Sequence, residues 1–290
     1  MWQEKLKPIY DLLIKDILLN VRTALAAGFK EIINLLPIKE MDKEADKEYF
    51  LSLMNHFLKD GEDKVSALVL PTLCTLVSKF SDAKKQELLE TLIKQKIESI
   101  KNLKNGRDNL VRMLEQLFEM FQPSQLMDLN FHEYLFDIIW NERAINYKVR
   151  AAKVIGSKIV VPLIKGKKHR ALLTAFTDKL RISKNFRDRQ IYICIATSAH
   201  SKDNEIFKKH FAKNIATDME NEKCQCVLIS LAKLCAVVKE GYSKSLDKVR
   251  AKLLASKDPT IIQYMPNCKE GKKIEQSRRY LALNYGEAKG

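Results

Sequence analysis

Near the start of the chain, apolar residues recur three or four positions apart over residues 6–17 and again over residues 21–32. This period is typical of amphipathic helices, because positions i, i+3, i+4 and i+7 share one helical face. The polar residues Asp16 and Asn20 lie at the junction of the two stretches. The pattern predicts a helix, a tight turn and a second helix. The first face consists of Leu6, Ile9, Leu13 and Ile17, and the second of Val21, Ala24, Leu25, Gly28 and Ile32.

An aspartate placed five residues ahead of a valine marks the start of the predicted second helix. Asp16 precedes Val21 by this distance, and Asp60 precedes Val65 by the same distance after another apolar helical face. An arginine follows the first of these valines, whereas Ser66 follows the second. The helix-turn-helix pattern therefore occurs at least twice, in the same register.

Further copies of the pattern continue along the chain. Val111 and Val149 are each followed by arginine, so that successive second helices are predicted 44, 46 and 38 residues apart. Two more steps of 37 residues lead to Phe186 and Lys223, and Lys223 again follows an aspartate, Asp218, by five positions. A period of about 37 to 47 residues is the signature of HEAT and armadillo arrays.

Two segments carry a resemblance to a known family: DILLNVRTALAAGF at residues 16–29 and DMENEKCQCVLISLAKL at residues 218–234. Both resemble HEAT repeats of the scaffold subunit of protein phosphatase type 2A. The resemblance covers about residues 5–265 as six or seven repeats. It implies an all-α fold, an α-solenoid of roughly six to seven HEAT-type helical hairpins over residues 1–265. Residues 266–290 are expected to form a C-terminal capping helix or tail, and Lys257, Asp258 and Pro259 to open a last turn.

The repeated polar positions have structural roles in this interpretation. The aspartates are expected to cap the second helices or to accept hydrogen bonds from turn amides. The arginines are expected to pair with an acidic turn residue of an adjacent repeat and so to form a ladder along one edge. The aspartates are Asp16, Asp60 and Asp218, and the arginines are Arg22, Arg112 and Arg150.

Composition agrees with helices and argues against several other classes. The 290 residues include 9 glycines and 7 prolines, fewer than a β-rich or loop-rich fold needs. No apolar run approaches the roughly 18 residues of a membrane span, and charged residues near the start argue against a secretory signal. Six cysteines are too sparse for a disulfide framework, and the Cys224 and Cys226 pair lacks the spacing of a strong zinc site. We expect a cytoplasmic or nuclear protein without metal or cofactor.

Positive charge is concentrated in one part of the chain. Residues 143–213 contain 18 Lys or Arg against four acidic residues, a net charge of +14, whereas the whole chain carries +15. Turns inside successive repeats of a solenoid line up, so a basic ridge of partner-binding residues is predicted at these turns. A basic loop is predicted between the fourth and fifth repeats. The ridge comprises Arg143, Lys148, Arg150, Lys153, Arg181, Lys184, Arg187 and Arg189, and the loop comprises Lys165, Lys167, Lys168 and Arg170.

These features favour a binding protein over an enzyme. The sequence lacks a glycine-rich phosphate loop, GxSxG and HExxH, and its five histidines are scattered. The leading hypothesis is a non-catalytic scaffold or adaptor that holds protein partners on its intra-repeat turns and inner helices. The resemblance implies a phosphatase catalytic subunit as one such partner. The resemblance gives no indication of the oligomeric state.

Three alternatives remain open at this point. The basic block of residues 143–213 is suited to nucleic acid or a ribonucleoprotein such as the ribosome. It is also explained by a solvated face that only promotes solubility. A HEAT-like alkylpurine DNA glycosylase is a more remote reading, because such an enzyme needs aromatic side chains and an acid at the lesion, and the only tryptophans are Trp2 and Trp140.

Overall fold

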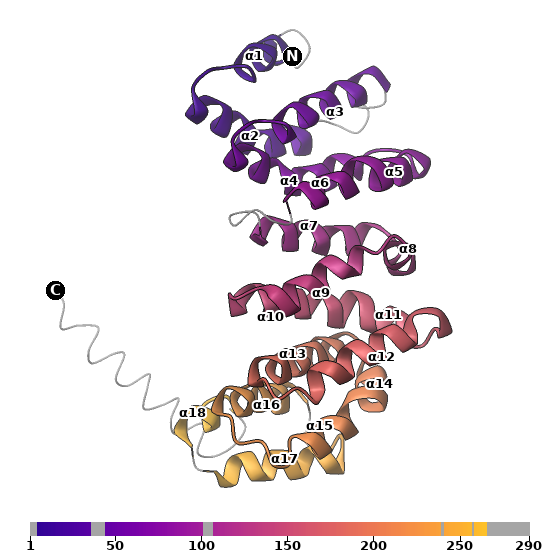
Figure 1. The fold of residues 1–290 in the computed structure, drawn as a ribbon, viewed down its shortest axis with the longest axis vertical. Helices are drawn as coiled ribbons and strands as arrows, with labels where there is room; N and C mark the ends of the chain where they lie inside the picture. The colour runs from indigo at the N-terminus through magenta and orange to yellow at the C-terminus, as the bar shows by residue number, and fades with distance from the viewer. Residues whose placement is uncertain (1–4, 36–43, 101–106, 239–240, 257, 266–290) are drawn as a thin grey trace, which may run out of the picture. The chain divides into compact units, whose positions relative to one another are not determined.

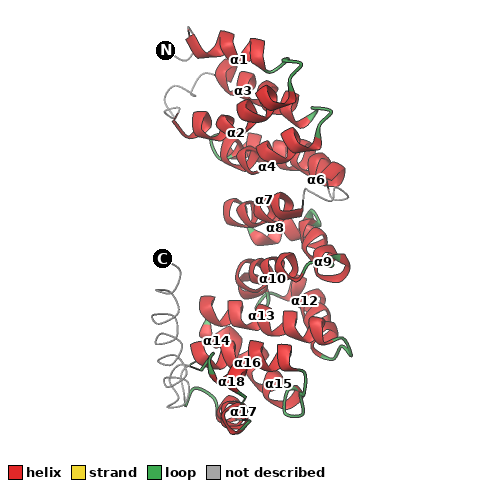
Figure 2. Cartoon of the chain, turned by 90° about the vertical axis from the view of Figure 1, so that its left-hand side faces the viewer, coloured by secondary structure: helices red, strands yellow, loops and turns green. Residues whose placement is uncertain are grey.

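The computed structural model describes residues 5–35, 44–100, 107–238, 241–256 and 258–265. Within these ranges every regular element is a helix and no strand occurs (Figure 2), so the all-α prediction is confirmed. The chain divides into two compact units, unit 1 over residues 1–135 and unit 2 over residues 136–290. The predicted capping helix or tail at residues 266–290 lies outside the described residues.

Unit 1 consists of helices that follow one another as antiparallel pairs (Figure 1). The second helices pack in sequence, α4 against α2 and α7 against α4, while α1 packs on α2 and α3 on α4. The elements are α1 (Lys7–Leu13), α2 (Leu19–Leu35), α3 (Glu44–Leu58), α4 (Asp63–Val77), α5 (Asp82–Leu88), the π-turn η3 (Leu89–Ile93), α6 (Lys94–Ile100), α7 (Arg107–Met120) and α8 (Pro123–Asp128).

Aromatic rings from three helices form the centre of the N-terminal core. Phe29 of α2 lies 6.3 Å from Phe50 and 5.4 Å from Phe57 of α3, measured between ring centroids, and 6.4 Å from Tyr10 of α1. All four side chains are buried. Because aromatic side chains bury large areas, this cluster fixes α1 and α3 against α2.

Unit 2 begins within α9 (Phe131–Asn141) and repeats the same arrangement. Its second helices also pack in sequence, α13 against α10 and α16 against α13, and α12 packs on α13. The elements are α10 (Ile145–Val154), η4 (Ile155–Val160), α11 (Val161–Leu163), α12 (Lys167–Arg181), α13 (Phe186–Lys202), α14 (Asn204–Phe207), η5 (Lys208–Ala212), α15 (Lys213–Asp218), α16 (Gln225–Val237), α17 (Lys244–Ala255) and α18 (Pro259–Ile262).

A π-turn joins α10 and α11 into one continuous helical segment. Pro162 lies just past this turn, and a proline inside an α-helix lacks the N–H for the ladder and clashes with the preceding turn. The wider turn of η4 is the kind of local adjustment that accommodates such a residue. Gly156 lies in η4, where a Cβ would stand 2.4 Å from the Ile195 carbonyl oxygen of α13. The two segments therefore pack backbone against backbone at this point.

Five of the six positions predicted for second helices fall in helices, Val111 in α7 among them, and the sixth, Lys223, lies two residues before α16 begins. Val21 and Val65 fall in α2 and α4, Val149 falls in α10, and Phe186 opens α13. At the C-terminal end, the Asp258 carboxylate accepts a hydrogen bond from the Thr260 N–H at 2.8 Å and caps α18. The last turn is therefore confirmed for Asp258 and Pro259, while Lys257 lies outside the described residues.

Candidate functional site

Five turns between described helices share one hydrogen-bond arrangement. In each, a side-chain oxygen accepts a bond from the backbone N–H two residues later, at the point where the second helix starts. A residue with a short polar or acidic side chain at this position therefore satisfies an amide that the helix leaves without a partner. The five bonds run from Leu18 to Asp16 (2.7 Å), Glu62 to Asp60 (3.0 Å), Ala144 to Glu142 (3.0 Å), Asn185 to Ser183 (3.1 Å) and Cys224 to Glu222 (2.8 Å).

Asp16 and Asp60 thus act as acceptors for turn amides, as one form of the prediction required. They do not cap the following helices: the N-cap of α4 is Glu62, whose side chain makes no capping bond. Asp218 is different, since it ends α15 and its carboxylate accepts from Arg181 Nη1 at 2.5 Å. The repeated aspartates therefore have different roles. Asp16 and Asp60 accept hydrogen bonds from turn amides in unit 1, whereas Asp218 pairs with an arginine in unit 2.

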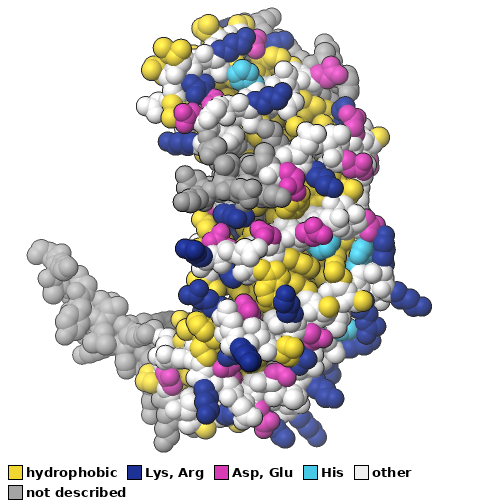
Figure 3. All heavy atoms as spheres, viewed as in Figure 1, with side chains coloured by type: hydrophobic (Ala, Val, Ile, Leu, Met, Phe, Trp, Pro, Cys, Tyr) yellow, Lys and Arg dark blue, Asp and Glu magenta, His cyan; other side chains and the backbone are white. Residues whose placement is uncertain are grey.

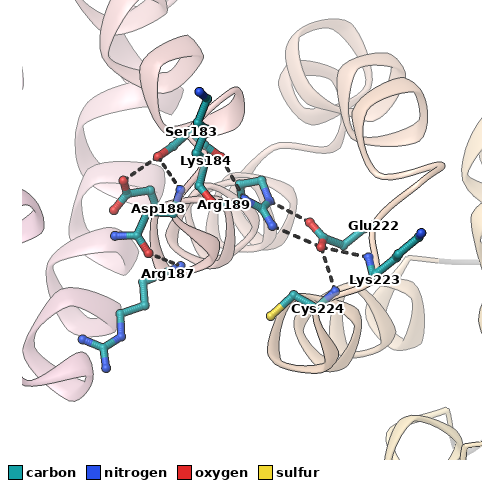
Figure 4. A network of polar contacts seen from close by, with 9 residues as sticks. Ser183, Lys184, Arg187, Asp188, Arg189, Glu222, Lys223 and Cys224 are labelled. Carbon is teal, nitrogen blue, oxygen red and sulfur yellow. Dashed lines mark hydrogen bonds and ion pairs between the residues drawn. The ribbon is translucent and has the colours of Figure 1, made fainter.

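Two arginines connect one turn with the next, as the predicted ladder requires. Arg22 donates to the carbonyl oxygens of Asp16 and Ile17 in its own turn, at 2.8 and 3.2 Å, and to the Asp60 carboxylate at 2.7 and 3.2 Å. Arg189 does the same in unit 2 (Figure 4). It donates to the carbonyls of Ser183 and Lys184 and to both oxygens of Glu222, at 2.7 and 3.1 Å.

The structure corrects which residues belong to this ladder. Arg112 pairs with Asp108 one turn earlier on its own helix, at 2.8 Å, and is 55% exposed. Arg22 and Arg189 each lie four residues after the N–H that the turn acceptor binds, and in the turn before α10 that position is occupied by Lys148. The prediction aligned valines, whereas the start of each helix sets the register.

The ladder carboxylates have lowered pKa values. Burial raises the pKa of Asp60 and of Glu222, but hydrogen bonds from Arg22 and Arg189, the turn N–H groups and the arginine charges outweigh it, so both pKa values fall below their ordinary values. Both side chains are only 6% exposed. Each carboxylate is consequently held in its charged form.

Acid is therefore expected to weaken the fold through these two groups. When a folded-state pKa is lower than the unfolded one, the stabilisation is present above the unfolded pKa and is lost as the pH falls through the folded pKa. We expect Glu222→Gln to lower the free energy of unfolding at neutral pH and to flatten its fall toward acid pH. Urea unfolding of both proteins across the acid range measures this. An identical pH slope in the variant would exclude Glu222 as a contributor.

Some cations of the predicted basic ridge are buried or pair with acidic residues of the chain, and others are exposed. Lys148 is buried on α10, which contradicts its assignment as a surface residue. Arg181 pairs with Asp178 and Asp218, and Arg189 with Glu222, so both are committed to holding turns together. Arg150 is half-buried. The exposed members are Arg143, Lys153, Lys184 and Arg187.

Large apolar side chains are exposed at the same turns. Ile145 is 39% exposed, Ile182 69% and Phe186 37%, although apolar residues of this size are usually buried. They alternate in sequence with exposed cations, and α10 and α13, which begin at these turns, pack against each other. Unit 1 shows the same feature at its first turn, where Ile17 is 92% and Leu18 60% exposed. We define the turn ridge as Arg143, Ile145, Ile182, Lys184, Phe186 and Arg187.

The predicted basic loop is wrong in part. Only Lys165 and Gly166 lie in the turn, because α12 already begins at Lys167 with Gly166 as its N-cap. Lys167, Lys168 and Arg170 are exposed on its first two turns. Exposed cations therefore gather on the edge of unit 2 over α11, α12 and α14 (Figure 3). We define the basic edge as Lys165, Lys167, Lys168, Arg170, Lys202 and Lys209.

The structure bears on the remaining chemistry as follows. Among the described residues there is no group of three or more His, Cys, Asp or Glu side chains that would hold a metal ion. Trp140 packs edge-on against Phe176, with the Lys179 ammonium 4.4 Å from its ring centroid, and Trp2 lies outside the described residues. No helix in the described part of the chain is long and apolar enough to cross a membrane.

Comparison with protein-family models finds no match to this chain, and a search of curated proteins finds none either. Sequence reasoning missed the exposed apolar residues of the turn ridge. Ile145, Ile182 and Phe186 were available as a signal, since each lies next to a turn, but apolar residues beside a turn are ordinarily assigned to the core.

Proposed function

We propose that this chain is a non-catalytic α-solenoid of HEAT-type hairpins that binds a protein partner along the turn ridge. The observation that carries the proposal is the exposure of Ile145, Ile182 and Phe186 among cations at consecutive turns. Protein interfaces combine a buried apolar centre with a polar rim, which this arrangement supplies. The partner surface is expected to be apolar at its centre and acidic around it.

Two observations support the solenoid. Second helices pack in sequence within each unit, α2, α4 and α7 in unit 1 and α10, α13 and α16 in unit 2. The ladder arginines Arg22 and Arg189 join neighbouring turns in the same way, although the two differ by 167 positions in the sequence. An array in which each repeat contacts its neighbours has both properties.

The first partner to test is a phosphatase catalytic subunit of the 2A type, because the segments at residues 16–29 and 218–234 resemble repeats of its scaffold. The full chain is immobilised and incubated with the purified subunit, with and without nuclease. Retention that survives nuclease supports direct protein binding. Loss of retention after nuclease would show that nucleic acid bridges the two proteins and would contradict the proposal for this partner.

Ile182→Ala with Phe186→Ala is expected to weaken partner binding at least about tenfold, because apolar anchors at the centre of an interface carry most of its affinity. Leu172→Ala is the matched control, since Leu172 is also exposed, at 45%, but lies nearer the other end of α12. Binding is measured by titration with the same partner. Equal affinities of wild type and double variant would remove the turn ridge as the interface.

A further inference from the structure

The basic edge lies at the opposite end of unit 2's helices from the turn ridge. Helix α12 runs from Lys167 at the edge to Arg181, next to Ile182 of the ridge, a rise of about 21 Å over its length. Helix α13 runs back from Phe186 to Lys202. A single small partner does not reach both surfaces, so the edge requires an explanation of its own.

Contacts between two successive hairpins bring the edge cations together. Lys165 Nζ lies 3.4 Å from the carboxylate of Asp203, which follows Lys202 directly. Burial lowers the pKa of His210 in η5, and the charges of Arg170 on α12 and of Lys209 lower it further. The cations therefore form one surface across both hairpins.

Acidic residues are few in the stretch of sequence that supplies the edge. Residues 143–213 contain only the acids Asp178, Asp188, Asp203 and Glu205. Asp178 pairs with Arg181 and Asp188 accepts from Ser183, both at the ridge end. Asp203, the acid that contacts Lys165, also accepts from the N–H groups of Glu205 and Ile206.

The placement of the cations opposes helix stability. The first turn of α12 contains no acidic residue, and its N-cap Gly166 supplies no side-chain acceptor. Cations at a helix N-terminus repel the positive end of the helix dipole, where acids are favoured. The Lys167 ammonium thus stands where the helix dipole disfavours a cation, and an external anion at this position would offset that cost.

The chemistry of the edge differs from that of the ridge. On α12 the one large apolar side chain that is exposed is Leu172. Lys167 and Arg170 instead border a shallow depression, whose other lining residues are Asp178 and the small side chains of Ala171, Thr174 and Ala175. Small side chains let a broad surface approach closely, and cations without apolar anchors suit phosphate contacts, which rest on charge.

We propose that the basic edge binds the phosphate backbone of double-stranded nucleic acid without reading its sequence. A duplex presents one negative charge per about 1.7 Å of axis, so it supplies several phosphates to cations from two hairpins packed about 10 Å apart. Tyr242, whose ring centroid lies 5.6 Å from the Lys208 ammonium, packs against His200 and Phe207 in tilted or edge-on geometry and is half-buried. A duplex is therefore favoured over a single strand, which needs exposed aromatic rings.

The test compares two triple variants of the full chain with equal charge. Lys167→Glu, Arg170→Glu and Lys209→Glu alter the edge, while Arg143→Glu, Lys184→Glu and Arg187→Glu alter the ridge. Each set lowers the formal net charge by six, from +15 to +9. Fluorescence anisotropy with labelled RNA and DNA duplexes of about 20 base pairs gives the dissociation constant between about 50 and 200 mM salt.

The edge variant is expected to bind at least about tenfold more weakly, and its slope of log affinity against log salt to fall by about three, because each phosphate contact contributes about 0.9. The ridge variant is expected to retain the wild-type slope. Equal losses in both variants, or no loss in the edge variant, would overturn the proposal. Glutamates suit the N-terminus of α12, so folding is expected to persist, and Lys167→Gln, Arg170→Gln and Lys209→Gln provide a second set without charge reversal.

Two further probes test whether the edge prefers another kind of polyanion to nucleic acid. Polyglutamate and vesicles that contain phosphatidylserine are titrated against the same variants. Weaker binding of both than of the duplexes supports nucleic acid, and tighter binding of either through the edge would overturn it. The relative affinities of RNA and DNA identify the duplex. Because the ridge variant is the one expected to lose the protein partner, failure of this proposal and failure of the proposed protein-binding function give different patterns.

Discussion

Gly156→Ala is expected to lower the free energy of unfolding of unit 2 by about 2 to 3 kcal/mol, even though alanine is the better helix former. The added Cβ would stand 2.4 Å from the Ile195 carbonyl oxygen and 2.9 Å from the Ser198 Cβ. The first of these atoms is backbone and belongs to α13, so relief requires moving a whole helix. Overpacking is therefore expected to outweigh the gain in helix propensity.

Gly28→Ala is the matched control for this substitution. Gly28 is also helical, on α2, but the nearest atom to its added Cβ is the Tyr10 hydroxyl oxygen at 3.9 Å. Alanine is expected there to raise stability by about 0.5 to 1 kcal/mol, since it restricts the unfolded chain without strain. Urea unfolding with hydrogen exchange assigns each effect to its unit. A Gly156→Ala protein as stable as wild type would contradict the close packing of η4 on α13.

Arg189→Leu is expected to destabilise unit 2 by about 2 to 3 kcal/mol, because it leaves the Glu222 carboxylate, 6% exposed, without its charged partner. The same change removes the hydrogen bonds to the Ser183 and Lys184 carbonyls. Water reaches Arg189 itself, which is 20% exposed, and this keeps the expected effect below that of a fully buried pair. Arg187→Leu, at an exposed position two residues earlier, is expected to change stability by less than about 0.5 kcal/mol.

A double-mutant cycle tests the cause of the Arg189 effect. If the ion pair is responsible, Arg189→Leu combined with Glu222→Gln costs about 1 kcal/mol or more less than the sum of the single changes. Chemical denaturation of the four proteins measures the coupling. Additive effects would mean that Arg189 acts through packing and the turn carbonyls alone.

The sequence was informative about helices and less so about their starting points. Apolar periodicity placed Val21, Val65 and Val149 correctly in second helices. It did not establish that α10 begins so that Lys148 takes the position of Arg22, because valine spacing varies by two residues between hairpins while hydrogen bonds in the turn do not. The turn acceptor, which lies three residues before each of these helices begins, was the better marker.

The site was predictable in charge but not in arrangement. The net excess of cations at residues 143–213 is a property of the sequence, and the separation into ridge and edge follows from which helix ends meet. Gly166 looked like part of a loop, and its role as the N-cap of α12 moved Lys167, Lys168 and Arg170 onto a helix. Exposure of Ile182 depends on tertiary packing, which periodicity does not reveal.

The ladder also gives each hairpin a direction. A hairpin with Arg22 or Arg189 supplies the donor for the hairpin after it, while its own turn carboxylate or hydroxyl can receive the donor of the hairpin before it. Because the donor and the acceptor lie on the same hairpin, both are copied when such a segment is duplicated. A new copy inserted in tandem therefore pairs with both neighbours without further change. In the turn before α13 the acceptor is Ser183, and there the preceding hairpin carries Lys148 in place of arginine. Lineages that gain or lose hairpins are thus expected to exchange these two positions as a pair.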